Sequence, residues 1–297
     1  MAFHPIDVLV DDLERTDRLA FDGGCYIDGR GEWISHAFVP VGLQAVVPDR
    51  DYRVDACRSN AGEREEPVPR GIAIALALLT TAAAAEYPDP ERFRPAIDAF
   101  LAADAEAPPP KDAIVATGSS SMRGWHSRIA EDLAPLTIIP RGFGGSNMKD
   151  VRHFLDELVL RHEPRAVLLY EGDNDAAGGV TPEQILVHFD AIAAGIHEVL
   201  PRTRIYILAV KPSIRRWNLW ESMSATNAMF ADRAARDARL TFIDIATPML
   251  GEDGKPLPEI FVADNLHMND AGYDIWRDVV RPILVDAEVG HEVMGQD

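Results

Sequence analysis

Short, wholly apolar runs alternate with longer segments of mixed polarity from about Pro90 to Val285 of the 297-residue chain. Runs that are apolar at every position are typical of strands buried on both faces of a parallel sheet, and the segments between them have helical spacing. The expected strands are 113–117, 136–140, 166–170, 204–210 and 240–245, and the expected helices are 92–103, 122–133, 148–160, 182–200, 219–237 and 270–285. This alternation predicts a three-layer α/β/α sandwich with an open, doubly wound parallel sheet.

The chain before this pattern predicts no motif over residues 1–67. Residues 68–85 then combine Arg70, an apolar run and an Ala-x-Ala-like end. This is the order of a secretory signal peptide, although a signal peptide begins its chain. Two interpretations stay open. In the first, which the order of the regions favours, residues 1–67 are an over-extended translation and 86–297 form a periplasmic or secreted domain. In the second, residues 68–85 are a buried helix that links an N-terminal unit to a cytoplasmic domain.

Composition limits the classes of partner. The chain is 47% hydrophobic and carries a formal net charge of −19, which argues for a globular protein and against nucleic acid or an anionic membrane surface as partner. The apolar run within 68–85 is too short to span a bilayer, so no integral membrane span is expected. The two cysteines, Cys25 and Cys57, form no C-x-x-C pair, so neither a zinc site nor a disulfide framework is indicated. Whether these two pair with each other stays open, as does the oligomeric state.

Glycines and polar side chains follow the predicted strands where the carboxyl ends of parallel strands meet at one edge. The four loops concerned are Gly118–Ser121, Arg141–Asn147, Glu171–Asp175 and Asp264–His267. Ester hydrolysis needs a nucleophile, a base, a group that orients the base, and donors for an oxyanion. The four loops together supply all of these residue types.

The roles follow from chemistry and spacing. Ser120 is the candidate nucleophile, because Ser119 is nearer the turn and Ser121 is already in the helix. His267 is the candidate base, since its ordinary pKa is close to neutrality. Asp264 lies three residues earlier, so that its carboxylate can reach the imidazole within one tight turn.

Two further residues have the chemistry of oxyanion donors. Gly145 can bring a bare backbone N–H close to a substrate, and Asn174 supplies a neutral side-chain donor. Each candidate also has a simpler interpretation as a helix cap or a turn former. The acidic residues around Asn174 have no histidine nearby at ligand spacing, which disfavours a metal site. The chain has no P-loop and no G-x-G-x-x-G after a strand, so no nucleotide cofactor is expected.

With these residues in place, the chain from about Pro90 to Val285 resembles the SGNH (GDSL-type) hydrolases. The marks of that family match Ser120, Gly145, Asn174 and His267, each in its own loop. The signature is G-S-S-S rather than G-D-S-L, as in a bacterial branch that this sequence resembles. The resemblance implies a flavodoxin-like fold, an esterase without metal or cofactor, and an oxyanion hole formed by Ser120, Gly145 and Asn174.

The resulting hypothesis is a serine hydrolase that acts on a short acyl ester, a lysophospholipid or an O-acetylated carbohydrate. Trp217, Trp220 and Arg141 are the candidate substrate-binding residues. Two alternatives stay open. The first is a non-catalytic module on the same fold that binds a glycan or a protein partner. The second is an acyltransferase that uses the same residues but excludes water from the acyl-enzyme.

Overall fold

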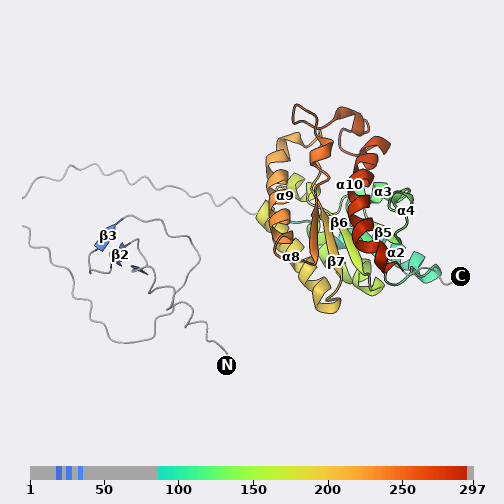
Figure 1. Ribbon diagram of the computed structural model, residues 1–297, viewed down its shortest axis with the longest axis horizontal. Helices are drawn as coiled ribbons and strands as arrows, with labels where there is room; N and C mark the ends of the chain where they lie inside the picture. Colours follow the sequence, from blue (N-terminus) through green and yellow to red (C-terminus); the bar gives the residue numbers. More distant parts are fainter. Residues whose placement is uncertain (1–17, 22–24, 29–32, 36–85, 293–297) are drawn as a thin grey trace, which may run out of the picture. The chain divides into compact units, whose positions relative to one another are not determined.

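The computed structural model describes residues 18–21, 25–28, 33–35 and 86–292, and the chain divides into two units, Met1–Leu76 and Ala77–Asp297 (Figure 1). In the first unit, β1 (Arg18–Phe21), β2 (Cys25–Asp28) and β3 (Trp33–Ser35) pair in order as an antiparallel sheet. The sequence pattern predicted no motif in this region.

Two predictions fall on residues that the structure does not describe. Residues 68–85, the expected signal peptide or linking helix, lie outside the described residues, and so does Cys57. The export of the protein therefore stays a prediction, and whether Cys25 pairs with Cys57 stays open. In the described part of the chain, no helix has the length and apolar character needed to cross a membrane.

The second unit is built on a parallel sheet of five strands. The strands are β4 (Ile114–Gly118), β5 (Ile138–Gly142), β6 (Ala166–Tyr170), β7 (Arg204–Leu208) and β8 (Leu240–Ile243). Their order across the sheet is β5-β4-β6-β7-β8, and each neighbouring pair is parallel. This is the order of flavodoxin-like folds, so the predicted open, doubly wound sandwich is confirmed.

The helices lie close to their predicted ranges, with two differences. The predicted helices 122–133 and 148–160 are each broken into shorter turns, and a short helix, α7, that the pattern did not predict follows β6. The α-helices are α2 (Arg94–Glu106), α3 (Ser120–Trp125), α4 (Ile129–Asp132), α5 (Met148–His153), α6 (Leu155–Leu158), α7 (Asp173–Ala177), α8 (Pro182–Val199), α9 (Trp220–Ala234) and α10 (Asp270–Glu288). The 3-10 turns are η1 (Pro90–Phe93), η2 (Leu160–His162), η3 (Trp217–Leu219), η4 (Thr247–Met249), η5 (Pro258–Ile260) and η6 (Val289–His291).

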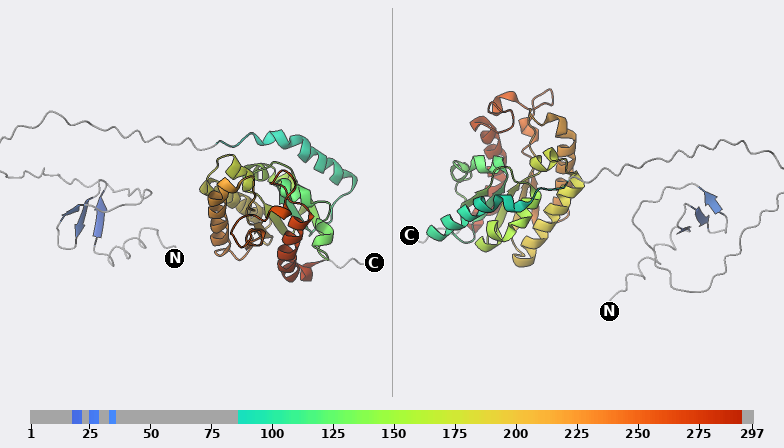
Figure 2. Two further views of the ribbon diagram at one scale, coloured as in Figure 1. Left: turned by 90° about the horizontal axis from the view of Figure 1, so that it is seen from above. Right: turned by 180° about the vertical axis from the view of Figure 1, so that it is seen from behind.

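Alternate side chains of each strand pack into two separate cores, one on each face of the sheet. Val115 packs into the core covered by α2, α5, α6, α8 and α9, whereas Ile114 packs into the core covered by α3, α4 and α10. Figure 2 shows α2 (teal) and α10 (red) on opposite sides of the sheet. Because both faces are covered, every position of β4 and β6 is buried, which explains why these strands are apolar throughout.

A buried carboxylate fixes the end of α10 against the amino ends of two strands. Glu288 is 0% exposed and accepts hydrogen bonds from Arg204 Nε at 2.5 Å, Tyr206 OH at 2.6 Å and Arg165 Nε at 3.2 Å. Arg165 directly precedes β6, and Arg204 begins β7. Helix α10 begins just after His267. The Glu288 cluster therefore fixes the carboxyl end of the helix whose amino end adjoins the His267 loop.

We predict that Glu288→Ala destabilises the fold by about 3–5 kcal/mol, because it leaves the buried Arg165 and the half-buried Arg204 without their shared carboxylate. Urea unfolding followed by circular dichroism measures the free energy of unfolding directly. The matched control is Asp286→Asn on the exposed side of the same helix, which we expect to change this free energy by less than about 0.5 kcal/mol. Equal stability of the Glu288 variant and the control would contradict the role of the buried cluster.

Candidate active site

The turn after β4 exposes one serine out of three. Gly118 has φ +135°, and a Cβ atom there would lie 2.0 Å from the carbonyl oxygen of Tyr170, so only glycine fits. Ser119 N donates to that same oxygen at 3.1 Å. Ser119 and Ser121 are buried, whereas Ser120, at the start of α3, is partly exposed. Ser120 is therefore the serine that a substrate can reach.

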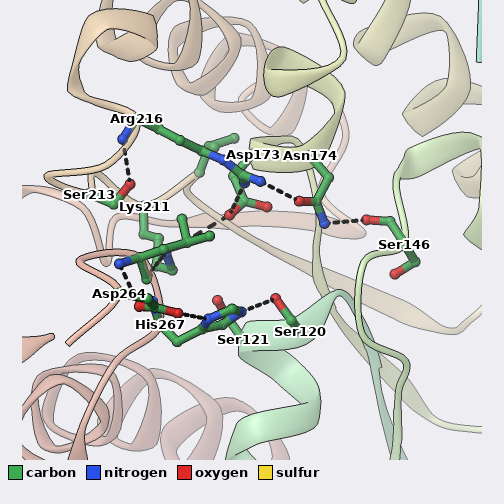
Figure 3. A network of polar contacts seen from close by, with 12 residues as sticks. Ser120, Ser121, Ser146, Asp173, Asn174, Lys211, Ser213, Arg216, Asp264 and His267 are labelled. Atoms are coloured by element: carbon green, nitrogen blue, oxygen red, sulfur yellow. Dashed lines mark hydrogen bonds and ion pairs between the residues drawn. The ribbon is translucent and has the colours of Figure 1, made fainter. Parts of the chain in front are cut away.

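A continuous chain of hydrogen bonds connects Asp264, His267 and Ser120 (Figure 3). Asp264 Oδ2 lies 2.6 Å from His267 Nδ1, and His267 Nε2 lies 3.0 Å from Ser120 Oγ. With Nδ1–H donating to the carboxylate, Nε2 is free to accept the serine hydroxyl proton.

Asp264 is fixed by the backbone of its own turn. Its Oδ1 accepts the N–H groups of Leu266 and His267, both at 2.9 Å. The hydrogen bond from the His267 side chain, with these two backbone bonds, holds the pKa of the Asp264 carboxyl well below its usual range. The Asp264 carboxylate thus remains ionised at neutral pH.

The loop after β5 brings an exposed backbone N–H beside this chain. Gly145 has φ +88° and is exposed, and Phe143 N donates to Gly118 O at 2.8 Å. Asn174 Nδ2 donates to Ser146 O at 2.8 Å, which joins the loop after β6 to the loop after β5. Within residues 86–292, the backbone N–H groups of Ser120 and Gly145 donate no hydrogen bond. The structure thus joins Ser120, His267 and Asp264 by hydrogen bonds and joins Asn174 to the loop that carries Gly145. A Cβ atom on the neighbouring Gly144 would lie 3.8 Å from Ser120 Cβ, so this loop runs next to Ser120.

A neutral histidine supports the strand that leads into this loop. His126 Nε2 accepts the N–H of Gly142 at 2.8 Å. Burial, and then the positive charges of Arg123 and Arg141, lower the pKa of His126 to about 4. The neutral ring is the form that can accept this hydrogen bond.

A buried charge cluster, which the sequence analysis did not single out, lies beside Asn174 (Figure 3). Arg216 Nη2 donates to Asn174 Oδ1 at 2.9 Å, and Arg216 Nη1 lies 3.0 Å from Asp173 Oδ2. Lys211, also buried, donates to Leu266 O at 2.8 Å, and burial lowers its pKa. The sequence carries only a weak signal for this cluster, because its residues are ordinary polar positions in the loops that follow β6 and β7.

The other acidic residues near Asn174 have structural partners. Asp175 Oδ1 accepts the N–H of Met148 at 3.1 Å and the Tyr87 hydroxyl at 2.7 Å, and Glu171 Oε1 accepts the Ser146 hydroxyl at 2.5 Å. Among the described residues, no group of three histidine, cysteine or acidic side chains is arranged to hold a metal ion.

One of the three predicted substrate-binding residues, Trp217, lines a pocket near the His267 loop, and Trp220 packs partly buried against the core. The rings of Trp217 and Trp220 stack with centroids 5.7 Å apart. Trp217 and Ile214 line a pocket of about 350 Å³, closed on its other side by residues 251–258. Arg215 N donates to Asn265 O at 3.0 Å, which places this segment next to the turn that carries Asp264.

Arg141 is placed differently from the prediction. It is 7% exposed, and its guanidinium forms an ion pair with Asp104 of α2 and lies 5.2 Å from the centre of the Phe100 ring. The side chain thus packs against α2 rather than toward Ser120, because it leaves the sheet on the α2 face. We do not include it in the candidate site.

Comparisons with known proteins agree with the fold of the second unit. The model of the GDSL-like Lipase/Acylhydrolase family matches residues 102–275, which is more than half of the chain. No curated protein sequence matches the chain.

Several solved structures share the fold of the second unit. A GDSL-like lipase of Bacteroides thetaiotaomicron has a TM-score of 0.57 at 19% identity, over 64% of this chain and 98% of its own. A provisionally assigned acylhydrolase of Bacteroides fragilis has a TM-score of 0.57 at 18% identity, over 68% of this chain and 99% of its own. A Streptococcus pneumonia protein, provisionally described as a platelet activating factor, has a TM-score of 0.58 at 18% identity, over 64% of this chain and 92% of its own.

We predict that protonation of His126 destabilises the fold in acid. Its pKa of about 4 in the folded chain lies below its ordinary value of about 6.5, so the unfolded chain binds the proton more readily between these two pH values. The stability that neutral His126 contributes is fully present above pH ~6.5 and is lost as the pH falls toward ~4. The loss in the free energy of unfolding is on the order of 2 kcal/mol after allowance for the partial exposure of the side chain.

The matched control is His126→Gln, whose amide oxygen can accept the Gly142 N–H and does not titrate. Urea unfolding of both proteins between pH 7 and pH 4 should show the wild type losing stability relative to the variant. Burial also lowers the pKa of His162, to about 4, but that residue is common to both proteins and cancels in the difference. If the free energy of unfolding falls equally with pH in the wild type and in the variant, the role assigned to His126 is contradicted.

Proposed function

The chain belongs to the GDSL-like lipase/acylhydrolase family, and from this premise we propose that it hydrolyses carboxylic esters through an acyl-enzyme on Ser120. The observation that carries the proposal is the unbroken chain from Asp264 through His267 to Ser120, at 2.6 and 3.0 Å. A serine hydroxyl within hydrogen-bond reach of a histidine that a carboxylate orients is the arrangement that nucleophilic acyl transfer needs.

In the first half of the reaction, Ser120 Oγ attacks the ester carbonyl carbon while its proton passes to His267 Nε2. A tetrahedral intermediate forms, and the former carbonyl oxygen carries the negative charge. The intermediate collapses by breaking the bond to the alcohol oxygen, which takes the proton from His267. Asp264 stays ionised throughout and stabilises the imidazolium.

The negative oxygen of the intermediate needs donors that are already in place. The N–H groups of Ser120 and Gly145 and the Nδ2 amide of Asn174 are the proposed oxyanion hole. The two backbone groups have no other acceptor within residues 86–292. One donor of this type contributes about 10²–10³-fold to kcat.

In the second half, water replaces the alcohol. His267 removes a proton from a water molecule while the water oxygen attacks the acyl carbon. The second tetrahedral intermediate uses the same oxyanion donors. It collapses by breaking the bond to Ser120 Oγ, which takes the proton back from His267. Carboxylic acid and free enzyme result. Every step is a proton transfer or a substitution at carbon, so the five residues suffice for the chemistry.

We propose that the pocket beside Trp217 receives part of the substrate. Its volume of about 350 Å³ is at the lower end of the range of small-ligand pockets. Stacked tryptophans offer an apolar face suited to a short acyl chain or to the ring of an acetylated sugar. A short acyl ester, a lysophospholipid or an O-acetylated carbohydrate therefore remains the proposed substrate class.

We predict that a fluorophosphonate probe labels wild-type protein on Ser120 and that Ser120→Ala abolishes both labelling and p-nitrophenyl acetate turnover. Peptide mass mapping locates the adduct. The matched control is Ser121→Ala, which removes the neighbouring buried hydroxyl and should keep both the adduct and most of the turnover.

An adduct on Ser119 or Ser121 would keep the reaction class but refute the assignment of the nucleophile. A folded wild type with neither adduct nor turnover would refute hydrolysis and leave a binding module on the same fold. An added alcohol acceptor that captures the acyl group in preference to water would make the protein an acyltransferase.

A further inference from the structure

The Asn174 side chain is held at both ends by groups of opposite hydrogen-bonding character. On one side Arg216 Nη2 donates to Oδ1 at 2.9 Å, and on the other Nδ2 donates to Ser146 O at 2.8 Å. A guanidinium can only donate and a carbonyl oxygen can only accept. Turning the amide over would therefore lose both hydrogen bonds and place donor against donor and acceptor against acceptor.

This constraint decides which atom faces the reacting group. Nδ2 carries two N–H bonds, and Ser146 O takes one of them, which leaves the second for a developing oxyanion. The opposite orientation would present the Oδ1 lone pairs to that negative oxygen. The amide of asparagine is nearly symmetric in shape, so packing alone does not distinguish the two orientations.

Arg216 is itself held in place. Its Nη1 lies 3.0 Å from Asp173 Oδ2, and its backbone N–H donates to Ser213 Oγ at 3.3 Å. The side chain of Asp173 is 4% exposed and that of Arg216 17%. Figure 3 shows Arg216 reaching from its loop across Asp173 to Asn174. Because these contacts fix the Arg216 guanidinium, its hydrogen bond to Asn174 Oδ1 does not depend on solvent.

The buried carboxylate of Asp173 lies near two cations, with Oδ2 3.0 Å from Arg216 Nη1 and 3.9 Å from Lys211 Nζ. The positive guanidinium of Arg216 lies directly behind the Asn174 carbonyl oxygen. A charge-assisted hydrogen bond at that oxygen polarises the amide and makes its N–H groups stronger donors.

We propose that Arg216 is a positioning residue for the oxyanion hole, which acts through Asn174 by fixing the orientation of its amide and strengthening its remaining N–H donor. This inference rests on the proposed function, because it explains how the oxyanion donor of Asn174 is held in place. In this proposal Arg216 acts through its contacts with Asn174 and Asp173 rather than on the substrate itself.

The test measures kcat and KM for p-nitrophenyl acetate in Arg216→Met, which keeps an unbranched apolar side chain but removes the guanidinium and its donors. We expect kcat to fall by roughly 10- to 100-fold with KM changed by less than about threefold, because the loss is confined to the transition state. Arg216→Lys, which restores a donor-only charge, should recover part of kcat. Arg215→Met is the matched control, because Arg215 is exposed and has no ion pair within residues 86–292, and it should behave as the wild type.

A double-mutant cycle separates action through Asn174 from a general structural role. Asn174→Ala alone should lower kcat by about 10²–10³-fold, and adding Arg216→Met should lower it by less than about a further twofold. Multiplicative effects would overturn the proposal, and so would wild-type kcat in Arg216→Met.

A second variant covers the case in which Arg216→Met leaves Asp173 buried without its partner and fails to fold. The combined change Arg216→Met with Asp173→Asn removes both charges of the pair, and it should show the same loss of kcat and the same coupling to Asn174. Turnover that survives Ser120→Ala would refute the proposed function itself. Turnover that requires Ser120 but is independent of Arg216 would refute only the positioning role.

Discussion

The close contact between the backbone at Gly118 and the carbonyl of Tyr170 is the constraint on which the rest of the site depends. No side chain fits at Gly118, since a Cβ atom would lie 2.0 Å from Tyr170 O, and the next N–H, that of Ser119, bonds to the same oxygen. β4 thus ends tightly against β6, and Phe143 N bonds to Gly118 O from the β5 side. The loops after β4, β5 and β6 therefore leave the same edge of the sheet, and α3 begins at Ser120 among them.

The polar groups of the site are held by buried partners rather than by solvent. Asn174 is fixed between Ser146 and Arg216, and Lys211 bonds to the carbonyl of Leu266 beside His267. Buried charges are costly unless they are paired, and here one carboxylate, Asp173, accompanies two cations. Such a cluster is weak support for stability, and its position behind a proposed oxyanion donor supports the positioning role proposed for Arg216.

The sheet and the Asp264–His267 pair were predictable because they depend on local signals: strands buried on both faces are largely apolar, and Asp264 and His267 are close enough along the chain to meet in one turn. Ser120 is 147 residues from His267, and its place beside that histidine was predictable only because the carboxyl ends of parallel strands meet at one edge of the sheet. Arg216 was not predictable as a partner of Asn174, since 42 residues separate them and only the fold brings them together. Arg141 was misplaced for a different reason: it lies near the carboxyl end of β5, at the correct edge of the sheet, but its side chain leaves the sheet toward α2. The short helix α7 lacks an apolar period of its own and begins at the polar residue Asp173.

The central claim is that Ser120, Gly145 and Asn174 present donors to one oxygen beside a nucleophile activated by His267. A crystal structure of the protein inactivated by a p-nitrophenyl phosphonate tests it most directly, because the bound phosphonate has the shape and charge of the tetrahedral intermediate. The account predicts phosphorus bonded to Ser120 Oγ and one phosphonyl oxygen within about 2.7–3.1 Å of all three donors. Phosphorus on another residue, or on Ser120 with that oxygen directed into solvent, would contradict it.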